Sequence, residues 1–148
     1  MAVFSSMFDK GSLPVLGYAA NFAYQRHQVL VNNLANVDTP HYKRLDLPVA
    51  EFQKAMRQAI EKMENRPVRI LEFGGSSRVK TGGDFGIQAD ILAAKTGTGM
   101  LKHDDNNVSP DREMVALSEN AMFHNALVQM MASDFNLMAS AIRERPGT

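Results

Sequence analysis

The chain of 148 residues contains no cysteine, which excludes disulfide bridges, thiolate zinc sites and a cysteine nucleophile. It also carries no net charge, because 16 basic residues balance 16 acidic ones, and this argues against a nucleic-acid-binding protein. No apolar run approaches the length that crosses a bilayer, and the first residues lack the basic and apolar regions of a secretory signal. Taken alone, these features favour a single cytoplasmic domain without a membrane span.

Catalytic motifs are missing as well. The sequence has no G-x-S-x-G, no P-loop, no G-x-G-x-x-G and no H-E-x-x-H. The stretch HDDNN at 103–107 offers oxygen ligands, but it lacks the glycine and the closing glutamate of a calcium loop. We therefore expect no enzyme, no catalytic residue, no metal site, no cofactor and no small-molecule substrate.

Methionine is abundant, and charge is unevenly spread. There are ten methionines and no tryptophan. The first 37 residues hold only three charged side chains, and residues 114–142 hold only Glu119 and Asp134. Both ends of the chain are therefore charge-poor, whereas the middle is strongly charged.

A first helix is predicted from Leu13 to Asn36. Ser12 can cap its start, and Pro14 is tolerated in a first turn. Apolar positions spaced alternately by four and three residues predict a heptad seam. This N-helix seam comprises Leu16, Ala20, Ala23, His27, Leu30 and Leu34.

The last helix is predicted to begin at Ser109-Pro110, an N-cap followed by proline, and to run for roughly 34 residues. At 1.5 Å per residue it would be about 51 Å long. Its predicted C-helix seam comprises Met114, Leu117, Ala121, His124, Val128, Met131, Phe135, Met138 and Ile142. Because His27 and His124 are polar seam positions, they are candidates for fixing the register of the two helices.

Between these helices the sequence predicts one amphipathic helix, at about 48–65, and then a Gly-rich extended segment. Short strands are possible at 68–73 and 85–92. The predicted fold is mainly α, with the two long helices pairing as a coiled coil. Within this one structural domain, residues 1–45 carry the first helix, residues 46–108 the middle and residues 109–148 the last helix.

The last helix is more apolar than one partner helix can bury. From Met114 to Ile142, 19 of 29 residues are apolar, and many of them lie off the predicted seam. A helix that is apolar nearly all round must be buried on most sides. Two interpretations remain open: packing against other chains, for which flexible methionines are well suited, or the core of a helical bundle.

The stretch NNLANVDTPHYK at 32–43 resembles the signature of the bacterial flagellar axial proteins, which build the rod and the hook. The matching positions, called here the axial signature, are Asn32, Asn33, Ala35, Asn36, Thr39, Pro40, Tyr42 and Lys43. His41 stands where that family usually has glycine. A second block at 106–131 resembles the family's C-terminal helix. The chain is too short for the large β domain of the distal members, and it lacks an insertion in the signature, so it resembles the proximal rod type.

This resemblance implies a structural subunit rather than an enzyme. Its terminal helices would form a tubular drive shaft that transmits torque, encloses the export channel and is required for motility. The implied partners are further copies, other rod proteins, and the membrane-ring, adapter and export-gate proteins. The implied location is the periplasmic rod, reached by type III export without a cleaved signal. The alternative is a cytoplasmic helical adaptor or flagellar export chaperone.

The three asparagines at the end of the first helix call for their own explanation. Asparagine favours helix ends and can donate its amide to carbonyls that lack a partner. We expect Asn32, Asn33 and Asn36 to serve carbonyls where several helix ends crowd together in an assembly.

Overall fold

The computed structural model describes residues 12–64, 71–81, 86–93 and 105–143. This part of the chain is mainly α and contains three helices, α2 (Leu13–Ala35), α3 (Val49–Glu64) and α4 (Pro110–Arg143). All three lie within one residue of the predicted bounds at each described end. None of these described helices is long and apolar enough to cross a membrane.

The helix starts differ in their capping. Pro110 opens α4, with Asp111 and Glu113 in its first turn, as the sequence predicts. At α2, proline again lies in the first turn, but Ser12 makes no side-chain cap. Its hydroxyl instead donates to the carboxylate of Asp134 on α4. The expected cap is therefore wrong, because a partner from the other helix takes the hydroxyl.

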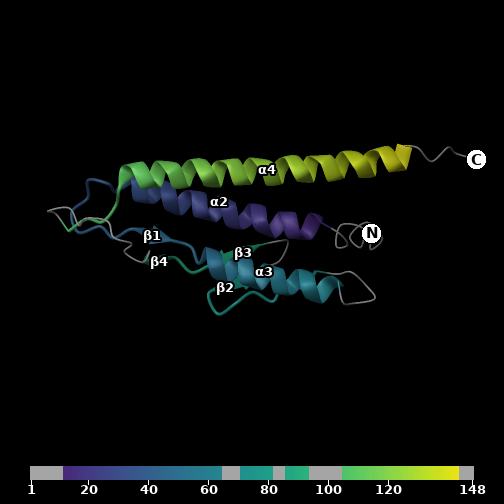
Figure 1. Ribbon diagram of the computed structural model, residues 1–148, viewed down its shortest axis with the longest axis horizontal. Coiled ribbons are helices and arrows are strands. Elements are labelled where there is room, and N and C mark those ends of the chain that lie inside the picture. The colour runs from purple at the N-terminus through teal and green to yellow at the C-terminus, as the bar shows by residue number, and fades with distance from the viewer. Residues whose placement is uncertain (1–11, 65–70, 82–85, 94–104, 144–148) are drawn as a thin grey trace, which may run out of the picture.

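The three helices form layers, with α2 in the middle (Figure 1). Helix α4 runs antiparallel beside one side of α2, and α3 lies on the other side. The end of α2 meets the start of α4 through Asn33 and Glu113, whereas the start of α2 meets the later part of α4 through Ser12 and Asp134. The predicted packing of the two long helices on each other is confirmed.

Two small antiparallel sheets complete the described fold. Strand β1 (Leu45–Asp46) pairs with β4 (Leu92–Ala93), and β2 (Val79–Thr81) pairs with β3 (Ile87–Ala89). The predicted strand at 85–92 is thus divided between β3 and β4. The strand predicted at 68–73 is absent from its described part, residues 71–73, and its first three residues lie outside the described chain.

The main core lies between α2, α3 and the β2–β3 sheet. The Phe22 ring stacks on Phe52 with centroids 4.1 Å apart, and Phe73 lies against Phe52 with centroids 5.8 Å apart. Buried aliphatic residues from α3 and both β2 and β3 surround these rings. Aromatic pairs of this kind stabilise a fold beyond their buried area. The side of α2 opposite α4 is therefore closed by residues of the same chain.

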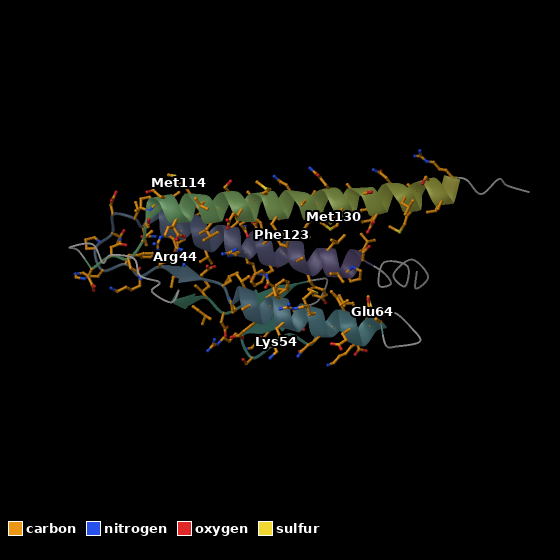
Figure 2. All side chains as sticks on the ribbon, viewed as in Figure 1. Arg44, Lys54, Glu64, Met114, Phe123 and Met130 are labelled. Atoms are coloured by element: carbon orange, nitrogen blue, oxygen red, sulfur yellow. The ribbon has the colours of Figure 1, made fainter. Side chains whose placement is uncertain are left out.

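This core predicts a sharp contrast between two neighbouring positions on α3. We expect Phe52→Ala to lower the free energy of unfolding by about 3–5 kcal/mol, because it leaves a cavity and removes both ring contacts. Lys54→Ala, at an exposed position of the same helix (Figure 2), should change it by less than about 0.5 kcal/mol. Urea unfolding of the full chain measures both, and equal losses would show that the helix, not the core, determines stability.

Candidate functional site

The end of α2 and the start of α4 are joined by a buried polar network centred on Asn33. This side chain is fully buried and makes four hydrogen bonds. Its amide donates to the Leu45 carbonyl at 2.7 Å and to the Glu113 carboxylate at 3.0 Å. Its oxygen accepts from the Leu45 N–H at 3.0 Å and from the Tyr42 hydroxyl at 3.1 Å. Asn33 thus uses its full hydrogen-bonding capacity to hold the chain that follows α2 against α4.

A chain of charges extends this network. Glu113 is fully buried, and its carboxylate accepts hydrogen bonds from Arg44 Nε and from Asn33. Arg44 also pairs with Asp46, which in turn pairs with Arg26 on α2 at 3.1 Å. Because an unpaired buried charge is strongly destabilising, Glu113 requires Asn33 of α2 and Arg44, just before β1, to lie beside it.

Asn106, in the segment before α4, holds the loop that follows α2. Its fully buried amide donates to the carbonyls of Asn36, Val37 and Thr39 at 2.8–3.1 Å. Its oxygen accepts from the Val108 N–H at 2.7 Å. The carbonyls left open where α2 ends therefore find their donor in the same chain.

Tyr42 and Lys43 tie the signature to the same region. Burial, and secondarily the negative charge of Glu113, raise the pKa of the Tyr42 hydroxyl, which favours its donor form. Lys43 Nζ lies 2.9 Å from the Asp105 carboxylate, and its hydrogen bond and charge lower the pKa of that carboxyl. The signature thus contacts the start of the C-terminal segment both inside the network and at the surface.

His41 and Asp105 adopt unusual backbone conformations at this corner. Both have φ of +61°, in the left-handed region that disfavours residues with a Cβ. Their side chains lie 3.8 Å apart at an exposed position. The glycine that the family usually has at the place of His41 would adopt this conformation without steric cost.

The axial signature therefore makes contacts within its own chain. Asn33 and Tyr42 join the network, whereas Asn32, Ala35, Thr39, Pro40 and Lys43 are exposed. Asn36 donates to the Asn32 carbonyl at 2.8 Å. The amides of Asn33 and Asn36 donate to carbonyls of their own chain, because the chain folds back after Pro40. These amides therefore have partners without a neighbouring chain.

The predicted N-helix seam lies only partly against α4. Ala23 and Leu30 are buried, and Leu16, Ala20 and Leu34 are half-buried. His27 is exposed, so it does not join a histidine pair inside the interface. The small side chains of this face let α4 approach closely, and the Ala23 carbonyl accepts a hydrogen bond from Asn120 at 2.8 Å.

The face that α4 turns to α2 is rotated from the predicted C-helix seam. The row with buried or half-buried side chains runs with spacings of four and three: Glu113, Leu117, Asn120, His124, Leu127, Met131, Asp134 and Met138. Four predicted seam residues belong to it. Of the other five, Ala121 is half-buried and the remaining four, Met114, Val128, Phe135 and Ile142, are exposed.

Polar partners cause this rotation. Asn33 and Ala23 on α2, and Ser12 just before it, bind Glu113, Asn120 and Asp134 on α4. Asn120 lies one heptad and Asp134 three heptads after Glu113. The sequence predicts Glu113 only as a negative charge in the first turn of the helix, and it predicts no role for Asn106 or Asn120. The seven-residue spacing of Glu113 and Asn120 was the available signal, but polar residues are rarely expected to face a helix interface.

The rotation leaves an outer surface of α4 that is apolar and exposed. It consists of Met114, Val115, Met122, Val128, Met130, Phe135, Leu137 and Ile142, with exposed fractions from 43% to 71%, and Phe123, 52% exposed, is not part of it. Figure 2 places Met114 on the outer side of α4 and Phe123 on the side turned toward α2 and α3. Large exposed apolar patches are often interaction sites.

A cleft of about 230 Å³ lies between α2, α3 and α4. Phe22, Phe52 and Phe123 line it together with polar Gln53 and Glu119. Its volume is below that of typical small-molecule pockets, which begin at about 300 Å³. The cleft is therefore large enough for one or two apolar side chains.

Comparisons with known proteins bear on this surface. No family model matches the chain. A flagellar basal body rod protein FlgB of Bacillus subtilis strain 168 is 29% identical over 139 residues, covering 93% of this chain and 96% of the relative. FlgB of Aquifex aeolicus strain VF5 is 25% identical, with 84% and 87% covered, and FlgB of Borrelia hermsii is 28% identical, with 80% and 85% covered.

The network predicts that Asn33 is essential for the folded subunit. Asn33→Leu, of similar size, should lower the free energy of unfolding by at least about 3 kcal/mol, because it removes four hydrogen bonds and one partner of buried Glu113. Asn32→Ala, at an exposed neighbouring position, should cost less than about 1 kcal/mol. Denaturant unfolding compares them, and similar losses would contradict a special role for Asn33.

The backbone at position 41 predicts a stabilising substitution. His41→Gly should raise the free energy of unfolding by about 0.5–1 kcal/mol. Glycine removes the left-handed backbone strain of about 1–2 kcal/mol, but part of this gain is offset because glycine loses more conformational entropy on folding. His41→Ala keeps the Cβ and should bring no gain. Thermal unfolding distinguishes the two, and a loss of stability in the glycine variant would show that the imidazole contact to Asp105 dominates.

Proposed function

We propose that this chain is a structural subunit of the proximal rod. Its similarity to four flagellar basal body rod proteins FlgB supports a rod protein of this type. Copies assemble through their terminal helices into a tube that transmits torque, encloses the export channel and is required for motility. The role is mechanical and involves no catalysis.

The observation that carries this proposal is the outer surface of α4. Its apolar residues extend along the whole helix, while the buried face of α4 already holds polar residues that have partners inside the subunit. If these apolar residues served the core of their own chain, they would be buried in it in preference to the polar residues. Surfaces of this kind become stable when neighbouring subunits cover them, and repeated heterologous contacts build open helical assemblies.

Other parts of the chain have supporting roles in this proposal. The axial signature and Glu113 hold α4 in the rotation that presents its apolar residues outward. Terminal helices of neighbouring subunits then pack in coiled-coil fashion, with methionines adapting to non-identical neighbours. The partners are further copies, other rod proteins, and ring, adapter and export-gate components, and the subunit reaches the periplasmic rod by type III export without a cleaved signal.

A cytoplasmic helical adaptor or export chaperone is the second candidate, because it too would present an apolar helix surface. Cell fractionation distinguishes the two. A rod subunit co-purifies with basal bodies, whereas an adaptor stays in the soluble fraction.

The proposal predicts separate effects on folding and assembly. Met122, the most exposed member of the outer surface, contacts little in the subunit. We expect Met122→Glu to change the free energy of unfolding by less than about 0.5 kcal/mol but to remove the chain from purified basal bodies and to abolish swimming. The reason is that assembly would bury an unpaired charge.

The matched control is Gln58→Glu, which adds the same charge at an exposed position of α3. It should leave assembly and swimming near the wild-type level. Normal motility in the Met122→Glu strain would refute a buried role for the outer surface of α4.

A further inference from the structure

We propose that the last turns of α4 in one subunit occupy the cleft between α2, α3 and α4 of the next subunit, with Arg143 pairing with Glu119 there. This inference rests on the proposed function and specifies one contact within it. The occupant is a second copy of this chain.

The last turns of α4 need a partner. Ser12, just before α2 begins, binds Asp134, so residues 135–143 extend about 13 Å beyond α2. Figure 1 shows this end of α4 projecting past the start of α2. Leu137 and Ile142 in these turns are 70% and 65% exposed. Among the described residues, no helix lies alongside this end to cover them.

The cleft offers a matching surface. Three phenylalanines contribute to its lining, and the Phe123 ring remains 52% exposed, so the cleft is an incomplete apolar pocket. An apolar cavity of about 150 Å³ can hold a benzene ring, and the cleft has about 230 Å³. A side chain of the size of Leu137 or Ile142 fills such a space and covers Phe123 at the same time.

Charge complementarity selects this occupant. After the first turn of α4, the described helix carries only three charged residues, namely Glu119, Asp134 and Arg143. Asp134 is engaged by Ser12, whereas neither Glu119 nor Arg143 forms an ion pair with another described residue. Glu119 lines the cleft, and so does Arg26, whose charge already pairs with Asp46. Arg143 follows Ile142 at the end of the helix. When Ile142 enters the cleft, the two unpaired charges come together.

The contact is heterologous, because it joins the end of α4 in one copy to the middle of the helical layers in the next. Such contacts repeat without closing and generate a filament or tube. The same contact would bury both the uncovered helix end and the open cleft, which are otherwise separate apolar surfaces of one subunit.

The first test reverses the charges. Glu119→Arg and Arg143→Glu, each at an exposed position, should each lower the amount of chain in purified basal bodies at least about tenfold, because like charges then meet. The double variant restores opposite charges and should return the amount to within about twofold of wild type. Arg57→Glu, at an exposed position of α3 that does not line the cleft, is the control and should remain near wild type.

The second test uses the absence of cysteine from the chain. Gln53→Cys at the cleft, combined with Ala141→Cys at the end of α4, should form disulfide-linked multimers in basal bodies, since a bridge needs Cα atoms within about 7 Å. Met122→Cys with Ala141→Cys, in which the first cysteine lies outside the cleft, should not. Single reversals that assemble like wild type, a double reversal no better than the singles, or equal cross-linking of both pairs would overturn the inference while leaving the rod function intact. Absence of the wild-type chain from basal bodies would overturn the proposed function itself.

Discussion

The contact between Glu113 and Asn33 determines how the two long helices lie against each other. A fully buried carboxylate must keep its partners, and here they come from Asn33 on α2 and Arg44 in the returning chain. This requirement fixes the level at which α4 starts beside α2 and the face that it presents. Asn120 and Asp134 then repeat the same kind of polar contact one and three heptads further along. Polar groups, rather than apolar ones, therefore set the register of the two long helices.

The apolar surface outside follows from the polar register inside. Glu113, Asn120 and Asp134 are turned toward α2, and many apolar residues of α4 therefore remain exposed. Helix α2 covers only one side of α4, and α3 packs on the far side of α2. A network of this type often lowers stability relative to an apolar interface but selects one arrangement among several. In the proposed assembly, such selection would present the same surface to every neighbour.

The sequence predicted the helices well, because proline, caps and the charge-poor heptads mark where α2, α3 and α4 begin and end. It predicted the packing of the long helices, but not which face of α4 meets α2. Periodicity is the same for the rows that contain Glu113 and Met114, so only the three-dimensional partners of Glu113 distinguish them. The β1–β4 pair was missed for a similar reason, since two-residue strands far apart in sequence carry no local pattern. The axial signature was recognised, but its role in closing the subunit became visible only in the contacts of Asn33 and Asn106.

In the proposed assembly, neighbouring chains cover the apolar side chains that α4 exposes in the isolated chain. Oxidative footprinting of methionine tests it most directly, because sulfoxide formation follows side-chain exposure. Met122 and Met130 on the outer surface should oxidise readily in the isolated chain and be protected in purified basal bodies, whereas Met56 in the core should be protected in both samples. Protection of Met122 and Met130 already in the isolated monomer, or their equal oxidation in both samples, would contradict the account.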